Sequence, residues 1–241
     1  MFGSKKQLLL VDDDEALVKS VVTDLKAAGH DVTVAATAPA AERSWREDRI
    51  DLVILDISLA PSEAAGGRMA DGIDLLRMIR RESDVPVIML TRTDVPSVKV
   101  LAFELGADDY VTKPFHSAEL VARVGAVFRR GAPAITRDEL FLEGRLTIDR
   151  AARQVIKDGS EVRLTPTEFE ILESLMEASG RAVTRRHLLE CAHSVDHQGD
   201  ERMVDVHVRH LRSKIEDESS SPTLILTVRG VGYRWGGTRG R

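Results

Sequence analysis

Residues 51–59, DLVILDISL, carry a run of branched apolar side chains that ends in an acid, Asp56. The segment Leu52–Asp56 shows no alternation of apolar and polar residues, which is typical of a strand covered on both faces. Strands of this kind occur in parallel sheets that have helices on both sides. The stretch therefore predicts a buried parallel strand with a carboxylate at its carboxyl end.

Apolar runs of this kind alternate with amphipathic stretches throughout the first half of the chain. The predicted strands are Gln7–Val11, Asp31–Ala35, Leu52–Asp56, Val87–Leu90 and Asp109–Thr112. Between the first two strands, Glu15–Ala28 spaces its apolar residues as a helix does, and Gly29 follows as a terminator. Strict alternation of strand and helix predicts an α/β domain with a doubly wound, five-stranded parallel sheet.

The periodic pattern stops near Arg129–Glu139, where Gly and Pro appear. We therefore predict domains over residues 1–130 and 139–241, with a linker over 131–138. The second domain begins with short strand-like pieces and ends in a β-rich run that Gly230 and Gly232 interrupt, as in a hairpin. Its predicted helices are Pro166–Ala178, Thr184–Cys191 and Glu201–Glu216. This order of elements predicts an α+β fold.

The formal net charge of −5 hides an asymmetry along the chain. Residues 1–131 carry 17 Lys and Arg against 21 Asp and Glu, whereas residues 181–241 carry 11 against 8. The distribution of charge informs on binding partners rather than on fold. Here the excess of basic residues makes the C-terminal end the part of the chain suited to an anionic partner.

The sequence also bears on where the protein works. No apolar stretch approaches the roughly 20 residues that cross a bilayer, and acids follow the short N-terminal apolar run where a signal peptide would be cleaved. The single cysteine, Cys191, excludes an intramolecular disulfide and is expected to be an inert, semi-buried thiol. We expect a cytoplasmic protein without a membrane partner.

Polar side chains stand where the predicted strands end. They are Asp12 and Asp13 after the first strand, Asp56 on the third, Thr91 after the fourth and Lys113 after the fifth. Because ligands bind beyond the carboxyl ends of the strands in an open parallel sheet, we expect these groups to converge. Clustered carboxylates repel one another unless a hard cation holds them, and oxygen ligands suit Mg²⁺. The set predicts phosphoryl transfer with Asp56 as nucleophile and with Thr91 and Lys113 binding the product's oxygens.

The segments VDDDEALV, DLVILDISL, PVIMLTRTD and LGADDYVTKPF resemble the receiver domain of bacterial two-component response regulators, over residues 5–130. The resemblance implies a flavodoxin-like fold and a sensor histidine kinase that donates a phosphoryl group. It implies that Asp12 and Asp13 bind the metal together with Asp56, and that Asp56 is the phosphoacceptor.

The same resemblance implies a switch near the acceptor. Thr91 matches the switch hydroxyl, and Tyr110 matches an aromatic ring that turns inward when the hydroxyl moves toward the phosphoryl group. Lys113 matches the family's site lysine, and Pro114 matches a cis Lys-Pro bond. Arg92 departs from the family, since a small residue is common there, and this bears on the lifetime of the phosphoryl group.

A second departure follows the acceptor. Asp71, in the DG that begins the next helix, follows Asp56 by 15 positions, about twice the family's usual distance. The extra residues include Ser62–Met69. We favour a tolerated surface insertion; the alternative is a segment that gates access to Asp56 or shapes kinase choice.

The segment Asp200–Asp217 predicts an amphipathic helix. Its expected core positions are Met203, Val204, His207, Val208, Leu211 and Ile215. Its expected surface positions are Arg202, Val206, Arg209, His210 and Arg212. A basic helix face is sized for the major groove of DNA, although charge alone fits an ordinary solvated helix equally well.

The segments LTPTEFEILESLM, RMVDVHVRHLRSKI and LTVRGVGYRW resemble the winged-helix domain of OmpR/PhoB-type regulators, over residues 138–236. The resemblance implies a helix in the major groove of promoter DNA and a hairpin wing at the adjacent minor groove. The implied DNA contacts are Arg202, Arg209, His210, Arg212 and Arg229. His210 stands where the family often has arginine, and an imidazole carries little charge at neutral pH.

The resemblance further implies that phosphorylated receivers form homodimers. Lys99 with Glu119, and Asp109 with Arg123, match charged pairs across the family's two-fold axis. The expected function is a phosphorylation-dependent transcription factor that works with RNA polymerase and is not a dedicated enzyme. Two alternatives remain: an aspartyl-phosphate hydrolase with outside substrates, and a phosphorylation-independent regulator that uses its receiver as a dimer scaffold.

Overall fold

A computed structural model describes residues 5–59, 71–92, 96–130, 140–143, 146–150, 152–192 and 201–237. The chain divides into two compact units, Met1–Gly125 and Ala126–Arg241, called here the N-terminal and the C-terminal unit. The division falls inside helix α5 (Ser117–Arg130), a few residues before the predicted domain end. The predicted linker, residues 131–138, and the insertion Ser62–Met69 lie outside the described residues.

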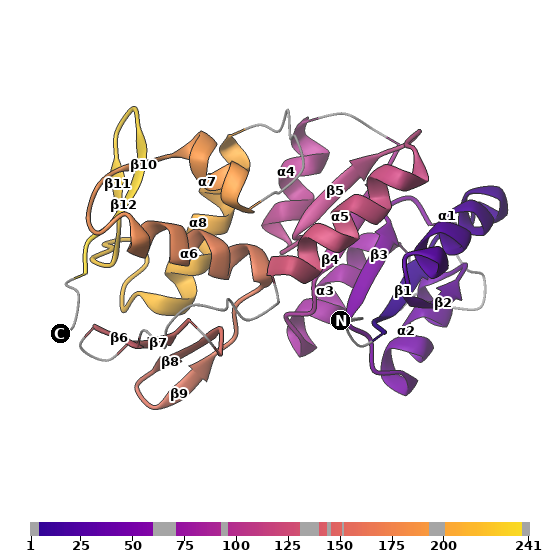
Figure 1. The fold of residues 1–241 in the computed structure, drawn as a ribbon, viewed down its shortest axis with the longest axis horizontal. Helices are drawn as coiled ribbons and strands as arrows, with labels where there is room; N and C mark the ends of the chain where they lie inside the picture. The colour runs from indigo at the N-terminus through magenta and orange to yellow at the C-terminus, as the bar shows by residue number, and fades with distance from the viewer. Residues whose placement is uncertain are drawn as a thin grey trace. The chain divides into compact units, whose positions relative to one another are not determined.

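Within its described part, the N-terminal unit is a parallel sheet of five strands with helices on both faces (Figure 1). The strands are β1 (Gln7–Val11), β2 (Asp31–Ala35), β3 (Leu52–Asp56), β4 (Val87–Thr91) and β5 (Asp109–Thr112). The helices are α1 (Glu15–Ala27), α2 (Ala38–Glu47), α3 (Gly72–Glu82), α4 (Pro96–Glu104) and α5. The predicted α/β fold is confirmed, and Thr91 is the last residue of β4 rather than the first residue after it.

Local signals in the sequence explain where these elements begin and why they are buried. Every residue of β3 and of β4 is buried, as expected for strands covered on both faces. The side chain of Asp14 caps α1 by accepting hydrogen bonds from the amides of Ala16 and Leu17. Asp71 caps α3 in the same way. Both caps belong to loops at the carboxyl edge of the sheet, so the residues that start the helices also shape that edge.

The strand order β2-β1-β3-β4-β5 decides which strand ends are neighbours. Strand β1 pairs with β3 in a register that places Val11 opposite Leu55. On the side away from β1, β3 pairs with β4, and β4 in turn pairs with β5. As a result, the acids that follow β1 and end β3 lie side by side at one edge, with the ends of β4 and β5 next to them.

Among the described residues, the C-terminal unit holds two antiparallel sheets and three helices (Figure 1). The four-stranded sheet has the order β6-β7-β8-β9, and the three-stranded sheet has the order β10-β12-β11. The strands are β6 (Leu140–Glu143), β7 (Leu146–Asp149), β8 (Gln154–Lys157), β9 (Ser160–Val162), β10 (Val183–Thr184), β11 (Ile225–Val228) and β12 (Gly232–Trp235). The helices are α6 (Pro166–Glu177), α7 (Arg185–Ala192) and α8 (Arg202–Ile215).

The predicted C-terminal hairpin is formed by β11 and β12. Gly230 adopts a φ of +74° in the turn, a conformation that side chains with a Cβ rarely take. Gly232 is needed for a different reason, because a Cβ there would overlap the carbonyl oxygen of Val183 on the neighbouring β10. The turn therefore accounts for Gly230, and the close approach of β10 accounts for Gly232.

Helix α8 buries all of its predicted core positions and one more. Val206 is only 7% exposed, so its predicted surface position was wrong. Helices α6 and α7 both pack against α8, and a helix with two neighbours buries an arc wider than a single apolar stripe. The basic residues are left with a narrower surface than the helical pattern indicated.

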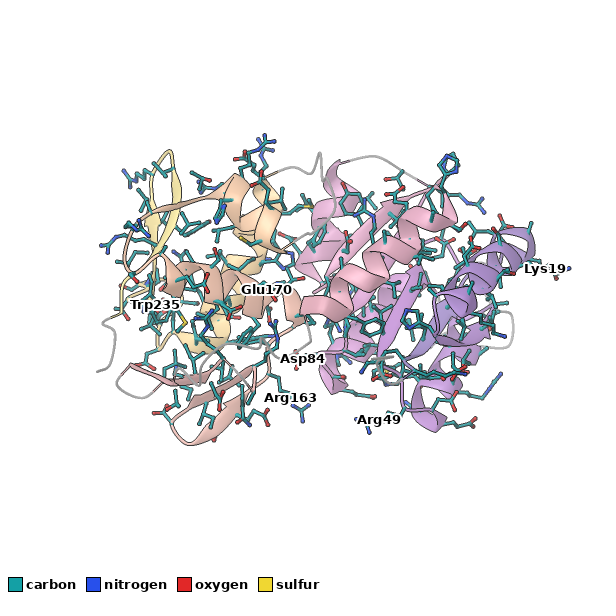
Figure 2. All side chains as sticks on the ribbon, in the orientation of Figure 1. Lys19, Arg49, Asp84, Arg163, Glu170 and Trp235 are labelled. Carbon is teal, nitrogen blue, oxygen red and sulfur yellow. The ribbon has the colours of Figure 1, made fainter. Side chains whose placement is uncertain are left out.

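Charged side chains cover the outside of both units. Lys19 on α1 and Arg49 after α2 are exposed and point away from the ribbon (Figure 2). Trp235, at the end of β12, is by contrast 6% exposed. Across the described ranges, none of the helices combines the length and the apolar character that a membrane span requires.

Candidate functional site

Three carboxylates meet at the carboxyl edge of the parallel sheet. Asp12 is 1% exposed and Asp56 is 0% exposed, whereas Asp13 is open to solvent. One oxygen from each of the three lies within 4.8 Å of the others. The strand order brings Asp12 and Asp13, which follow β1, next to Asp56 at the end of β3. The structure therefore brings Asp56 next to Asp12 and Asp13, from which the sequence separates it by more than forty positions.

Lys113, which follows β5, reaches across to the same group. Its Nζ lies 2.5 Å from Oδ2 of Asp56 and 2.7 Å from Oδ2 of Asp12. Its backbone amide donates a 2.6 Å hydrogen bond to the carbonyl of Thr91. Burial by itself would lower the pKa of Lys113, but its close contacts with the two carboxylates outweigh this effect and raise the pKa. Lys113 is therefore a fixed cation in contact with two anions.

One ammonium does not balance three carboxylates. Burial raises the pKa of Asp12, and the nearby charge of Asp56 acts in the same direction, although Lys113 and the amide of Asp14 oppose them. Asp12 Oδ2 is within ion-pair distance of Lys113, yet no group in the described residues donates to it with hydrogen-bond geometry. A buried carboxylate oxygen of this kind is suited to a cation, and the three acids fit Mg²⁺, which prefers oxygen ligands.

Backbone groups hold the acceptor carboxylate in place. The amide of Ser58 donates a 2.9 Å hydrogen bond to Asp56 Oδ1, while Oδ2 faces Lys113. Gly72, the first residue of α3, packs so closely on the backbone that a Cβ there would overlap the carbonyl oxygen of Asp56. In the sequence, the DG of this helix marked only a distance from Asp56, and the packing role of Gly72 was not predicted. Its signal was a glycine directly after a helix cap.

The two predicted switch residues lie on neighbouring strands. Thr91, on β4, is 2% exposed, and Tyr110, on β5, is half-buried. The ring of Tyr110 packs edge-to-face on Phe103 of α4, with ring centroids 5.7 Å apart. Phe103 was not among the residues predicted for the site. The Lys113-Pro114 peptide bond is cis, as the receiver resemblance implied.

The predicted dimer residues form a cluster within one chain. Arg123 of α5 donates to both carboxylate oxygens of Asp109 and, at 2.7 Å, to Glu119. Burial by itself would lower the pKa of Arg123, but the charges and hydrogen bonds of Asp109 and Glu119 outweigh burial and raise that pKa. The pairing of Asp109 with Arg123, predicted between two chains, is thus made inside a single chain. The side chain of Lys99 lies outside the described residues.

Helix α8 and the hairpin carry the predicted DNA contacts. Arg202, Arg209 and Arg229 are exposed, and His210 is partly buried. Arg212 differs, because its guanidinium donates to the carbonyl of Ile225 at 2.6 Å and 3.0 Å and to the hydroxyl of Thr227. Arg212 therefore fastens α8 to the hairpin, and its contact with DNA stays a prediction.

A second group that fastens α8 to its neighbours was not predicted from the sequence. Asp205 of α8 accepts hydrogen bonds from Arg185 Nε at 2.7 Å and from the hydroxyl of Tyr233 at 2.6 Å. The guanidinium of Arg185 also lies over the ring of Tyr233, 5.1 Å from its centroid. Burial and the hydrogen bond to Asp205 raise the pKa of Tyr233 to about 12. These contacts tie α7, α8 and β12 together.

Comparison with known proteins agrees with this two-part architecture. Residues 8–125 match the family model of the response regulator receiver domain. Residues 159–235 match the model described as the C-terminal part of transcriptional regulatory proteins. The two matches fall in the N-terminal and the C-terminal unit, respectively.

Full-length relatives extend the match across both units. The transcriptional regulatory protein AfsQ1 of Streptomyces coelicolor is 43% identical over 227 residues, covering 94% of this chain and 96% of that protein. The DNA-binding response regulator MtrA of Mycobacterium tuberculosis is 41% identical over 235 residues, covering 96% and 97%.

Solved structures also align with nearly the whole of this chain. The response regulator DrrB of Thermotoga maritima, titled an OmpR/PhoB homologue, is 33% identical with a TM-score of 0.50, covering 97% of this chain and 100% of that one. A mutant of RitR is 26% identical with a TM-score of 0.71, covering 98% and 100%. The chain belongs to the OmpR/PhoB-type response regulators, with a receiver domain followed by a winged-helix DNA-binding domain.

Proposed function

We propose that this regulator accepts a phosphoryl group on Asp56 from a sensor histidine kinase and thereby controls the binding of its winged helix to promoter DNA. The observation that carries the proposal is the contact of the buried Asp56 carboxylate with Lys113, beside Asp12 and Asp13. A surface aspartate needs no such arrangement. A nucleophilic carboxylate in a group-transfer site needs both the cation beside it and the neighbouring acids that can hold a metal ion.

The residues around Asp56 support a direct transfer. A carboxylate oxygen of Asp56 attacks phosphorus, the phosphorus–nitrogen bond of the donor phosphohistidine breaks, and the imidazole keeps the electron pair. Lys113 contacts one oxygen of the acceptor carboxylate and faces the oxygens of the incoming group, while the Ser58 amide orients the carboxylate. Asp12, Asp13 and Asp56 would hold Mg²⁺, which when bound offsets the negative charge of the phosphoryl oxygens.

Thr91 and Tyr110 are the proposed carriers of the signal. Thr91 is buried at the end of β4, on the strand next to Asp56. A new dianionic group on Asp56 would attract the Thr91 hydroxyl. Tyr110 stands one strand further, against Phe103 of α4, so movement of Thr91 would free space for its ring. A phosphoryl group would in this way change the surface formed by α4, β5 and α5.

The output follows from that surface and from the basic face of α8. We propose that phosphorylated receivers pair as homodimers, so that two winged helices occupy neighbouring half-sites and recruit RNA polymerase. Pairing raises the effective concentration of the second DNA-binding unit. The relative MtrA is named a DNA-binding response regulator, which supports this output. We propose no dedicated enzymatic activity beyond loss of the phosphoryl group by hydrolysis.

The test combines chemical labelling with DNA binding. The chain is incubated with acetyl phosphate and Mg²⁺, and intact-mass and peptide measurements locate the added phosphoryl group. We expect the label on Asp56, its loss in Asp56→Asn and its suppression by a chelator, with Asp31→Asn, an exposed acid of the same unit, as the matched control.

DNA fragments that the labelled protein selects from genomic DNA are then titrated with both forms of the protein. We expect tighter binding by the phosphorylated form and more dimer in sedimentation. A label on another residue would overturn the acceptor assignment. Equal affinity of the two forms for every selected fragment would overturn the proposed control of DNA binding.

A further inference from the structure

Arg92 is a cation at the rim of the receiver site that the transfer described above does not use. It follows Thr91 directly at the carboxyl end of β4, and its side chain is exposed. In the register of β3 and β4, Asp56 stands opposite Leu90, so Arg92 lies two positions further along the neighbouring strand. The receiver resemblance puts a small residue at this place, so the guanidinium is a group that the resemblance does not supply.

The charge of Arg92 acts across the end of β3. The backbone amide of Leu17 does most to lower the pKa of Asp14. The charges of Lys113 and Arg92 lower that pKa further. Asp14 lies in the loop after β1, and β3 stands between β1 and β4 in the sheet. The field of the guanidinium therefore covers the edge at which Asp56 ends.

The two cations of this edge differ in their partners. Lys113 Nζ contacts both Asp12 and Asp56. Within the parts of the chain that the structure describes, the guanidinium of Arg92 makes no hydrogen bond or ion pair. A guanidinium presents parallel N–H groups that match the oxygens of a phosphoryl group. Arg92 is therefore available to bind an anion that enters the site from solvent.

Phosphorylation would bring such an anion. Before transfer, the three carboxylates of the site carry three negative charges, which Lys113 and a bound Mg²⁺ balance. An acyl phosphate on Asp56 carries about two negative charges in place of one. The phosphorylated site then holds one negative charge more than these cations balance. Arg92 supplies the missing positive charge.

We propose that Arg92 binds the oxygens of the phosphoryl group on Asp56 from the solvent side and prolongs the life of the aspartyl phosphate. The inference rests on the proposed function, since it requires Asp56 to be the acceptor. It goes beyond that function by naming a residue of this chain that sets how long the phosphorylated state lasts.

The chemistry of hydrolysis gives the direction of the effect. A water oxygen attacks phosphorus, the bond from phosphorus to the Asp56 oxygen breaks, and the carboxylate keeps the electron pair. In a loose transition state, negative charge moves from the phosphoryl group to that leaving carboxylate. A cation on the phosphoryl oxygens therefore stabilises the ground state more than the transition state, which slows hydrolysis.

The experiment measures the loss of the phosphoryl group from the full chain. The proteins are labelled with acetyl phosphate in Mg²⁺, the donor is removed by rapid desalting, and intact mass follows the label. We expect Arg92→Gln to lose the label about two- to fivefold faster than the wild type, the effect of one solvent-exposed charge contact. Arg92→Lys should be intermediate, because lysine keeps the charge but not the paired N–H groups. Arg49→Gln, at an exposed arginine of the same unit, is the matched control and should decay at the wild-type rate.

Salt dependence distinguishes a charge contact from a change of shape. Raising the salt concentration should shorten the wild-type lifetime toward that of Arg92→Gln and leave the variant nearly unchanged. Peptide measurements locate the label in each protein. A label on Asp56 that lasts equally long in the wild type and in Arg92→Gln would overturn the role of Arg92 and leave the acceptor assignment intact. A label on another residue would overturn both.

Discussion

Lys113 Nζ lies 2.5 Å from Oδ2 of Asp56, so the cation that follows β5 is in contact with the acid that ends β3. Strand β4 separates these two strands in the sheet. The contact is possible because the lysine extends over the carboxyl edge, where Thr91 ends β4 and binds the Lys113 amide. Acceptor, hydroxyl and cation thus stand at the ends of three neighbouring strands, on one edge of the sheet.

Replacing Lys113 with alanine should slow phosphorylation by acetyl phosphate by about 10²-fold, the usual effect of removing one preorganised charge from a transfer site. The rate is measured from intact mass in saturating Mg²⁺. Lys19→Ala, an exposed lysine on α1, is the matched control and should react at the wild-type rate. Equal rates for Lys113→Ala and Lys19→Ala would show that the Lys113 contact has no role in transfer.

Gly72→Ala should disturb the acceptor, because the added Cβ would overlap the Asp56 carbonyl oxygen. Overpacking against backbone costs about 1–3 kcal/mol, and we expect a lower free energy of unfolding together with slower phosphorylation. Gly29→Ala is the matched control, since Gly29 has a φ of +93° but no atom within 4 Å of an added Cβ. It should lose about 1–2 kcal/mol of stability through backbone strain and keep its phosphorylation rate. A normal rate in Gly72→Ala would refute the positioning role.

Arg123→Ala should destabilise the unphosphorylated monomer. Asp109 is 1% exposed and pairs with Arg123 in the same chain, so the variant leaves a buried charge without its partner. Removing one partner of a buried pair costs about 3–5 kcal/mol. Urea unfolding of the monomer measures the change, with Arg77→Ala, whose pair with Asp74 is exposed, as the control. An unchanged midpoint would mean that the pair matters only between chains.

The variants Arg212→Ala and Arg209→Ala should have different effects: the first should lower stability, and the second should weaken DNA binding. Arg212 donates to Ile225 and Thr227, and its loss should lower the free energy of unfolding of the C-terminal unit by about 1–3 kcal/mol. Arg209 is exposed, so its loss should leave stability within about 0.5 kcal/mol while weakening DNA binding and reducing its salt dependence. Thermal unfolding and DNA titrations at several salt concentrations measure both effects. Equal stability of the two variants would contradict the fastening role of Arg212.

The C-terminal unit should lose stability in alkali through Tyr233. Its pKa is raised from 10.0 to about 12 in the folded state, so the unfolded chain releases the proton first. The stabilisation is complete below pH 10 and is lost as the pH rises toward 12, by about 2–3 kcal/mol for two pKa units. Urea unfolding is followed by the fluorescence of Trp235 in a Trp45→Phe background. Tyr233→Phe should lack this alkaline loss, and an identical pH profile in both proteins would contradict the prediction.

Several features could be predicted from the sequence because they depend on neighbours along the chain. The unbroken apolar run that ends in Asp56 required a strand buried on both faces, and alternation with amphipathic helices required a parallel sheet. Once the sheet was parallel, the acids and Lys113 had to lie at one edge. The boundaries of α1 and α8 were predicted to within one residue, since caps and apolar spacing are local signals.

The remaining features depended on groups that are distant in the chain. No spacing indicated that Gly72 would pack on the Asp56 carbonyl, that Arg212 would bind β11, or that Val206 would be buried. The same holds for Asp109 with Arg123, where either chain of a dimer could have supplied the partner. Sequence patterns report which faces are apolar and which residues can carry charge. The tertiary structure decides which partner each charge meets, because that choice depends on the distance between elements and on the water excluded where they pack.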